Sequence, residues 1–339
     1  MKGGAGQRIE SHSGEIDRLL LAAFLAQSSG FLSGEELSTA LHVSRTTVWK
    51  RIRSLKEHGF VFESAPSRGY RLVSSPDSLH PAAVAAGMST IRLGGAIVSF
   101  AETGSTNTAA ARLGEEGASE GLVVLAESQL QGKGRLGRTW TSPHGVNLYC
   151  SVLLRPRIPP SSAPQLTLLS AVAAARAIRN CTRLTPVIKW PNDILVNGNK
   201  VAGLLNEMTA ETDQVATVVL GIGVNLNMLR DQFPEELRHP ASSLLLEGGE
   251  LVDRIHFTRC LLEILDELYD RYLSGGYPEI RDEWLSWCGI IGRRVLVRDT
   301  TAPEREGVAR GIDENGALLL QLNDGAIERI LTGDVRLCT

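Results

Sequence analysis

The chain has 339 residues, of which 43% are hydrophobic and 22% are charged, with a formal net charge of −3. This length exceeds what one hydrophobic core supports, so two or three domains are expected, and the composition excludes a disordered chain. Residues 1–75 nevertheless carry ten Lys/Arg against seven Asp/Glu. A basic module on an acidic body indicates that one part meets nucleic acid while another part does something else.

The cysteines and the N-terminus indicate a cellular compartment. Residues 1–15 are polar and Gly-rich, unlike a signal peptide, and the apolar run 19–26 is far shorter than the roughly 20 residues that a membrane helix needs. Scattered cysteines without a Cys-x-x-Cys pair favour neither zinc nor disulfides, so a reducing cytoplasm is expected, with no membrane partner. The five are Cys150, Cys181, Cys260, Cys288 and Cys338.

Three helices are predicted first. Ser33 and Glu36 have the spacing of a capping box, and Ser44 is a further N-cap. Apolar residues recur at helical intervals within each segment, and Gly59 ends the third. The predicted helices span residues 16–27, 34–41 and 45–58.

The spacing of these helices is that of a helix-turn-helix. Two short strands around the turn 65–69 follow it, typical of a β-hairpin wing. The third helix is then the recognition helix, with its N-terminus at base edges and its cations at phosphates. The alternative is an amphipathic helix pair with a solvated basic face. The candidate DNA-binding residues are Ser44, Arg45, Thr46, Thr47, Lys50, Arg51 and, at the wing tip, Arg68.

A second unit begins after the linker-like residues 74–78. A strand at 95–102 leads to Ser105, Thr106 and Asn107, which are candidate N-caps of a helix through about residue 116. Capping is the plain interpretation, and we expect at least one of them to cap. Three small polar groups at a strand-to-helix junction also suit a polar ligand.

The next strand, 122–126, leads into a glycine-rich basic loop at 129–140. Three glycines alternate there with three cations, and Trp140 closes the run. Glycines bring backbone N–H groups close to an anion, and cations add charge-assisted hydrogen bonds. The spacing is neither that of a P-loop nor Gly-x-Gly-x-x-Gly. The alternative is a flexible basic surface loop. The alternating residues are Gly132, Lys133, Gly134, Arg135, Gly137 and Arg138.

A hairpin and a glycine-containing strand complete this unit. Asn197-Gly198 is a strong turn signal, and it places Lys200 at the start of a strand. Such a lysine is usually solvated. Gly221 and Gly223 lie inside the strand 215–225, where glycine marks a close approach by a ligand or another segment. A strand at 147–154 and helices at 163–179 and 255–273 are also expected. Residues 292–339 read as four short strands, a small β-barrel pattern.

Together these motifs resemble the biotin–protein ligases, in the bifunctional form that is also the biotin operon repressor. The residues that carry the resemblance are Ser105-Thr-Asn107, Gln129, Gly-Lys-Gly-Arg-Leu-Gly-Arg (132–138), Lys189-Trp-Pro-Asn-Asp193 and Lys200-Val-Ala-Gly203. The resemblance implies an α+β multidomain fold. Its parts are an N-terminal winged helix-turn-helix (1–75), a central α/β catalytic domain (76–288) and a small C-terminal SH3-like β-barrel (289–339).

The resemblance also implies ligand contacts. Ser105, Thr106 and Asn107 match residues at the biotin head, and Gln129 matches a biotin-contacting glutamine. Lys200 matches a lysine near the biotin carboxylate, and with Arg135 it is the implied catalytic pair. The loop residues Gly132, Lys133, Gly134, Arg135 and Arg138 match the ligand loop, with Trp140 either covering the ligand or packing in the core. Gly203, Gly221 and Gly223 match positions where the backbone approaches the ligand. Lys133 departs from the commoner arginine and loses its bidentate fork.

The implied reaction forms biotinyl-5′-adenylate from biotin and ATP, then transfers biotin to a lysine of a biotin carboxyl carrier protein. Mg²⁺ is expected on the ATP phosphates, with no metal site of the protein's own. Operator DNA and a homodimer formed with the adenylate bound are further implied partners. Alternatives are a lipoate-type ligase, a ligand-sensing regulator without activity, and a biotin ligase that does not regulate.

Overall fold

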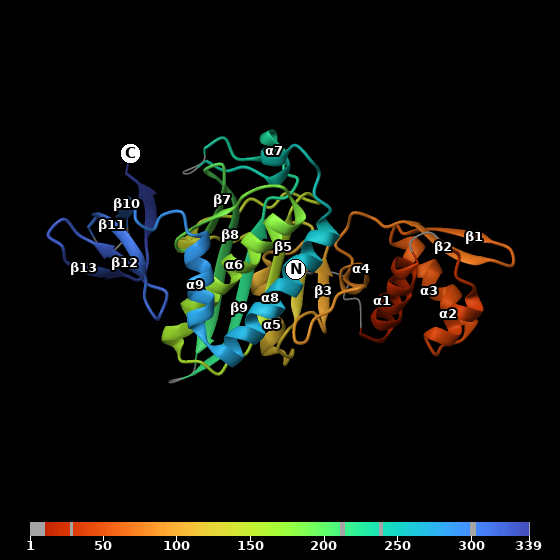
Figure 1. The fold of residues 1–339 in the computed structure, drawn as a ribbon. Coiled ribbons are helices and arrows are strands. Elements are labelled where there is room, and N and C mark those ends of the chain that lie inside the picture. Colours follow the sequence, from red (N-terminus) through yellow and green to blue (C-terminus); the bar gives the residue numbers. More distant parts are fainter. Residues whose placement is uncertain (1–10, 28–29, 211–213, 237–239, 299–302, 339) are drawn as a thin grey trace, which may run out of the picture.

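The structure is a computed structural model that describes residues 11–27, 30–210, 214–236, 240–298 and 303–338. Three units follow one another in a row, with the largest in the middle (Figure 1). The N-terminal unit and the C-terminal sheet lie at opposite ends of that row. Residues 1–10, which belong to the segment that we compared with a signal peptide, lie outside the described residues.

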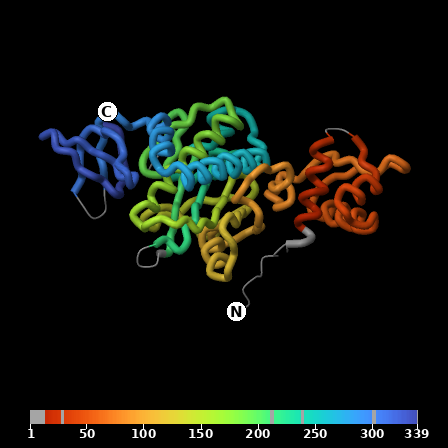
Figure 2. Tube along the Cα trace, turned by 60° about the horizontal axis from the view of Figure 1, so that its bottom comes forward, coloured from red at the N-terminus to blue at the C-terminus, as the bar shows by residue number. Residues whose placement is uncertain are grey.

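The N-terminal unit is a winged helix-turn-helix. Its elements are α1 (Ser11–Ala26), α2 (Gly34–Ala40), α3 (Arg45–Glu57) and an antiparallel hairpin of β1 (Val61–Ala65) and β2 (Gly69–Ser74). Both predicted caps are confirmed, since Ser33 Oγ accepts from Glu36 N–H and Ser44 Oγ accepts from Thr47 N–H, each at 3.1 Å. Helix α1 starts at Ser11, five residues before the predicted position, so the polar residues ahead of Ile16 are also helical. A short helix, α4 (Pro81–Ala85), lies in the segment that connects this unit to the next (Figure 2).

The central unit is built on a mixed seven-stranded sheet in the order β3-β4-β5-β9-β8-β7-β6. Only β3 and β4 are parallel; the other neighbours are antiparallel. The Asn-Gly hairpin is confirmed, with Asn197 and Gly198 both at positive φ between β7 and β8. The strands are β3 (Ile97–Phe100), β4 (Val123–Ala126), β5 (Leu148–Leu154), β6 (Val187–Lys189), β7 (Asp193–Val196), β8 (Asn199–Ala210) and β9 (Val215–Val224).

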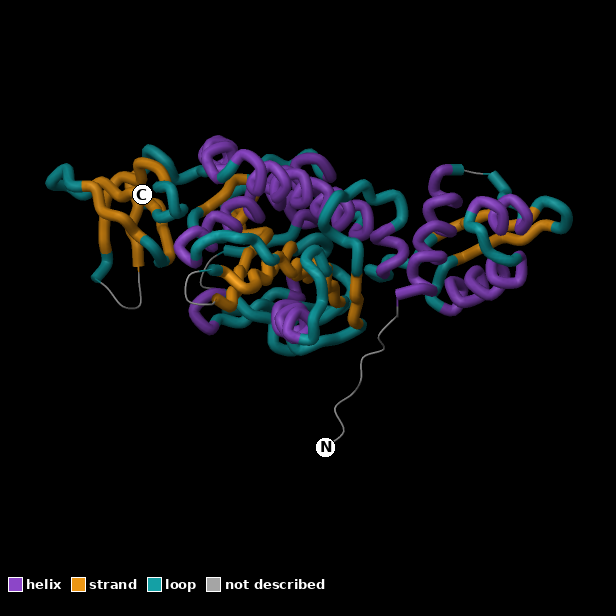
Figure 3. Tube along the Cα trace, turned by 90° about the horizontal axis from the view of Figure 1, so that it is seen from below, coloured by secondary structure: helices purple, strands orange, loops and turns teal. Residues whose placement is uncertain are grey.

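Helices cover both faces of this sheet (Figure 3). The apolar helices α6 and α8 pack against each other and share one large core with the strands. On the opposite face, α5 buries Ala109 and Leu113 against Val124 and Leu153 in a smaller core. No described helix is long and apolar enough to cross a membrane. The helices are α5 (Thr106–Glu115), α6 (Ala163–Cys181), α7 (Leu244–Gly248), α8 (Arg254–Gly275) and α9 (Tyr277–Trp287).

The C-terminal unit is a five-stranded antiparallel sheet in the order β13-β12-β11-β10-β14. The sequence predicted four of these strands and missed the fifth, because it is four residues long and two of them are charged. The missed strand, β14, directly follows Gly333 and pairs with β10 at the edge of the sheet. The strands are β10 (Arg294–Arg298), β11 (Arg305–Ile312), β12 (Leu318–Gln321), β13 (Ile327–Ile330) and β14 (Asp334–Leu337).

Candidate functional site

The strand-to-helix junction at the start of α5 forms one wall of a pocket. Ser105 occupies the N-cap position, as one of the three candidates was expected to, but its side chain makes no capping hydrogen bond. Gln129 serves the helix end instead: its Oε1 accepts from the backbone N–H of Thr106 at 2.8 Å and from its hydroxyl at 3.1 Å. Gln129 Nε2 also donates to Ser142 Oγ at 3.0 Å, which ties this wall to the segment after the loop.

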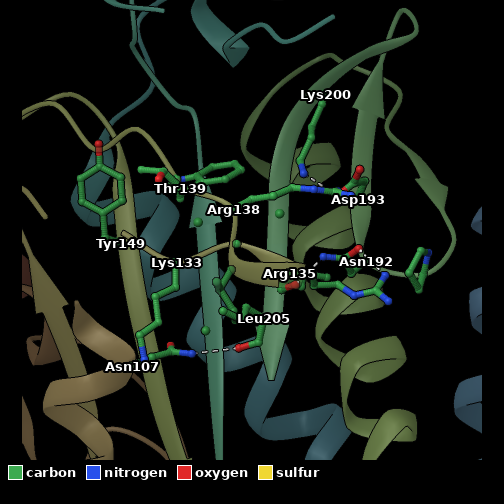
Figure 4. A pocket seen from close by; sticks show the side chains of 18 of the residues that line it. Asn107, Lys133, Arg135, Arg138, Thr139, Tyr149, Asn192, Asp193, Lys200 and Leu205 are labelled. Carbon is green, nitrogen blue, oxygen red and sulfur yellow. Dashed lines mark hydrogen bonds and ion pairs between the residues drawn. The ribbon is translucent and has the colours of Figure 1, made fainter. Parts of the chain in front are cut away.

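Asn107 is buried, and every polar atom of its side chain has a partner. Its Nδ2 donates to Leu205 O at 3.1 Å and to Glu207 Oε2 at 2.8 Å, and its Oδ1 accepts from Ser151 Oγ at 2.6 Å (Figure 4). A Cβ at Gly221 would lie 2.3 Å from Asn107 Oδ1. The side chain that approaches Gly221 closely is therefore Asn107 of α5, and both residues line the pocket.

The glycine-rich basic loop folds back on itself above the sheet. Trp140 N–H donates to Gly132 O at 2.8 Å, and Gly134 N–H donates to Arg138 O at 2.7 Å. Leu136 and Gly137 form the tip, both at positive φ. These hydrogen bonds within the loop hold it as an ordered hairpin. A flexible surface loop, which was the alternative, would lack such internal hydrogen bonds.

The three cations of this loop contact β8, the turn between β6 and β7, and the C-terminal unit. Lys133 Nζ lies 3.2 Å from Glu207 Oε1 on β8. Arg135 donates to Asn192 Oδ1 at 3.3 Å and to Thr332 Oγ1 at 2.8 Å. Arg138 donates to both carboxylate oxygens of Asp334, and this hydrogen bonding raises the pKa of Arg138. The loop therefore connects the central sheet to the C-terminal unit.

Lys200 is held at the pocket wall, unlike the solvated hairpin lysine that was the alternative. Its Nζ lies 2.6 Å from Asp193 Oδ1, and the two side chains are only 24% and 15% exposed (Figure 4). Burial lowers the pKa of the neighbouring Lys189. The sequence prediction did not assign a role to Lys189, Asn192 or Asp193, although the Lys-Trp-Pro-Asn-Asp motif that contains them was the available signal.

Trp140 lies across the two neighbouring strands β8 and β9. A Cβ at Gly203 or at Gly223 would come within 2.8 Å of atoms of its ring. Lys200 Nζ lies 5.3 Å from the ring centroid, within the range of a cation–π contact. The half-buried ring therefore lies against Gly203 and Gly223, which line the pocket together with it, and its buried Nε1 has no hydrogen-bond partner.

These side chains line one pocket. Five cations and two carboxylates contribute to its walls, an excess of three positive charges that suits an anionic ligand. Among the residues that the structure describes, no group of three or more His, Cys, Asp or Glu could hold a metal ion. The cations are Lys133, Arg135, Arg138, Lys189 and Lys200, and the carboxylates are Asp193 and Asp334.

The predicted DNA-binding residues divide into two groups. Ser44, Arg45, Thr46, Lys50 and Arg68 are exposed and Thr47 is half-buried, while Arg45 pairs with Glu35. Arg68 lies over the ring of Phe31, 4.3 Å from its centroid.

Arg51 is the exception, because its side chain is engaged within the winged helix. Its guanidinium forms a bidentate ion pair with the buried Asp17 of α1, with one N–O distance of 2.7 Å. Its side chain is only 21% exposed. A buried carboxylate needs a counter-charge, so Arg51 fastens α1 to α3, and a phosphate contact by Arg51 stays a prediction.

Known proteins resemble this chain over nearly its whole length. The bifunctional ligase/repressor BirA of Bacillus subtilis (strain 168) is 38% identical over 318 residues, which cover 94% of this chain and 97% of the relative. The chain belongs to the bifunctional biotin ligase and repressor family. The BirA of Escherichia coli (strain K12) is 32% identical over 322 residues, covering 94% and 96% of the two chains.

Models of each part of the bifunctional biotin ligase and repressor also match. Residues 18–71 match an HTH domain, residues 99–225 the biotin/lipoate A/B protein ligase family, and residues 290–337 the biotin protein ligase C-terminal domain. A solved biotin protein ligase from Aquifex aeolicus, in complex with biotin and ATP, superposes with a TM-score of 0.61 at 28% identity. It covers 72% of this chain and 98% of that structure.

Proposed function

We propose that the pocket beneath the glycine-rich loop is where this bifunctional ligase and repressor joins biotin to ATP, before passing biotin to a lysine of a biotin carboxyl carrier protein. The observation that carries the proposal is the convergence of loop cations, Lys200 and Gln129 from separate elements on one pocket. The names of the relatives, which include biotin–[acetyl-CoA-carboxylase] ligases, supply the ligand class.

In the first step, a biotin carboxylate oxygen attacks the α-phosphorus of ATP. A bond forms between them while the bond to the bridging oxygen breaks, and pyrophosphate leaves. The carboxylate needs no base, but two anions must be brought together. Lys200 is assigned to the biotin carboxylate, and Arg135 and Arg138 to the phosphates, where fixed charges offset the repulsion. Asp193 pairs with Lys200 and Asp334 with Arg138, so two of these cations are held in place by carboxylates.

Mg²⁺ is assigned to the phosphates as a further source of positive charge. Asp193 lines the pocket beside Lys200, and one carboxylate together with phosphate oxygens is a donor set that Mg²⁺ accepts. The ion would therefore be held mainly by ATP.

In the second step, the neutral amine of the acceptor lysine attacks the carbonyl carbon of the mixed anhydride. A C–N bond forms, the bond from that carbon to the phosphate oxygen breaks, AMP leaves, and the amine loses a proton. Water would destroy the anhydride, so the ordered loop and the ring of Trp140 are assigned the task of excluding it.

The winged helix makes the same chain a repressor. Its exposed recognition helix is assigned to operator DNA, as a homodimer formed when the adenylate is bound, because a two-fold protein matches a two-fold operator. A gel shift with DNA upstream of biotin synthesis genes tests this arm. Retarded DNA only with biotin and ATP supports it, and no shift under either condition supports a ligase without a regulatory role.

The lipoate alternative is tested with ATP–pyrophosphate exchange. Biotin should start the exchange, and lipoate at the same concentration should not. Exchange driven by lipoate alone would favour a lipoate-type ligase.

A further inference from the structure

Trp49 is the exposed large apolar side chain of the recognition helix α3, with 49% of its surface accessible among the described residues. The buried stripe of α3 consists of Val48, Ile52 and Leu55, which face the core of the winged helix. Trp49 is outside that stripe, so packing of the domain does not explain a tryptophan at this position.

Residues three and four apart on a helix are neighbours on its surface. Thr46, Trp49, Lys50 and Arg53 have this spacing and are all exposed, so they form one continuous strip, here called the α3 strip. Arg51 lies on another side of α3, where its ion pair with Asp17 fastens it to α1. The side of α3 left for a partner is therefore the α3 strip.

The α3 strip combines positive charge with one aromatic ring. The guanidinium of Arg53 lies 5.8 Å from the centroid of the Trp49 ring, so it adds charge beside the indole. Arg53 also pairs with Glu57 at 3.5 Å, one turn further along, but its side chain remains 67% exposed. Cations beside an exposed ring suit a polyanion that carries apolar groups between its charges.

We infer that Trp49 reads a thymine C5-methyl group in the major groove, with Lys50 and Arg53 on the flanking phosphates. The major groove admits an α-helix, and the thymine methyl is the apolar group that it presents. Base-edge contacts give sequence specificity, whereas phosphate contacts give position. The inference rests on the proposed operator binding, and it makes Trp49 a specificity-determining residue that the predicted DNA-binding set lacked.

The test uses the full chain with biotin and ATP, and a duplex selected by the wild-type protein from a randomised library. Each thymine of the duplex is replaced in turn by deoxyuridine, which removes only the methyl group. For the wild type, at least one replacement per half-site should weaken binding roughly four-fold, equivalent to about 0.8 kcal/mol per buried methyl. The variant Trp49→Ala should bind the unmodified duplex at least about ten-fold more weakly and lose sensitivity to that replacement.

The control is Leu25→Ala, which removes an apolar side chain that is 46% exposed on α1. It should keep wild-type affinity and the full deoxyuridine effect. Circular dichroism of Trp49→Ala confirms that the winged helix is folded, and Trp49→Phe, which keeps a ring, should recover part of the affinity.

Two results overturn the inference while leaving DNA binding intact. One is a folded Trp49→Ala protein with wild-type affinity. The other is a deoxyuridine effect that is absent in the wild type or persists unchanged in Trp49→Ala. A wild-type protein that selects no duplex at all would instead overturn the proposed operator binding, and the inference with it.

Discussion

Arg138 of the glycine-rich loop donates two hydrogen bonds to Asp334 of the C-terminal sheet, from Nη1 at 3.1 Å and from Nη2 at 2.5 Å. The two residues are 196 positions apart in the chain. Arg135 of the same loop also reaches this unit, through Thr332. The C-terminal unit therefore helps to hold the loop over the pocket.

Asp334→Asn should loosen the loop when no biotin or ATP is added. It removes the charge of a partly exposed pair, a change of about 1 kcal/mol, so trypsin should cut the loop about five-fold faster. Mass spectrometry of timed digests measures cleavage after Arg135 and Arg138. The control Asp324→Asn changes a turn of the same sheet, where the asparagine oxygen still accepts from Ala326 N–H. Equal cleavage of wild type and Asp334→Asn would show that the ion pair does not hold the loop.

Arg135→Ala should shorten the lifetime of bound adenylate. Loss of charge-assisted hydrogen bonds costs about 1.5–3 kcal/mol, so dissociation should be at least about ten-fold faster. Release of labelled biotinyl-adenylate, followed by filter binding, measures it. Arg112→Ala, which breaks an exposed ion pair with Glu116 on α5, should leave the lifetime unchanged. A normal adenylate lifetime in Arg135→Ala would remove this arginine from the site.

Lys133→Arg should have the opposite effect. Lys133 makes one contact with Glu207 through a single ammonium, whereas arginine offers a planar fork to phosphate. We expect adenylate release to slow by about three-fold, in keeping with a gain of ~0.6 kcal/mol. Lys56→Arg on the winged helix is the matched control. Faster release from Lys133→Arg would mean that lysine is the better residue in this loop.

Lys200→Ala should stop the first half-reaction. Removing one preorganised positive group costs about 10²–10³ in rate, so ATP–pyrophosphate exchange should fall at least about a hundred-fold. The thermal midpoint should fall little, because the pair with Asp193 lies at the pocket wall. Lys56→Ala serves as the control. Exchange at the wild-type rate would show that Lys200 has no part in the chemistry.

His80 should make the joint between the winged helix and the central unit sensitive to acid. Burial, together with the nearby His58 and Arg51, lowers the pKa of His80 to about 4. Its Nδ1 accepts from Ala82 N–H at 3.3 Å, which the protonated ring could not do. The unfolded chain binds a proton below its ordinary pKa near 6.5, so stability should fall as the pH drops from about 6.5 to about 4.

The pH effect is measured by urea unfolding at several pH values. The loss should amount to about 3 kcal/mol over this window and level off below it. His80→Asn keeps a capping side chain but cannot titrate. The free energy of unfolding of this variant should therefore depend less on pH between about 4 and about 6.5. A variant with the same pH dependence as the wild type would assign the slope to other groups.

Local features were predictable from the sequence because their causes are local. The caps at Ser33 and Ser44 depend on residues three positions away, and the Asn197-Gly198 turn on two residues that tolerate positive φ. The position of the glycine-rich basic loop, directly after a buried strand, was likewise predictable from its alternating glycines and cations.

Tertiary partners were not predictable in the same way. Asp334 lies in a short charged strand that has no clear pattern, and its role appears only when β14 pairs with β10. Arg51 lies on α3 where a phosphate contact was expected, but it forms an ion pair with the buried carboxylate of Asp17 on α1. At the start of α5, the backbone N–H of Thr106 donates to the side chain of Gln129, and Ser105 makes no capping hydrogen bond. In each case a residue distant in sequence decided the outcome.

The central claim is that one pocket activates biotin and passes it to a carrier protein, and transfer of labelled biotin tests this most directly. The purified chain is mixed with ATP, Mg²⁺, labelled biotin and a biotin carboxyl carrier domain, beside Lys200→Ala and Lys56→Ala. We predict label on a lysine of the carrier, one AMP released per biotin, and transfer by the wild type and Lys56→Ala only. An unlabelled carrier with the wild type, or equal labelling by Lys200→Ala, would contradict the claim.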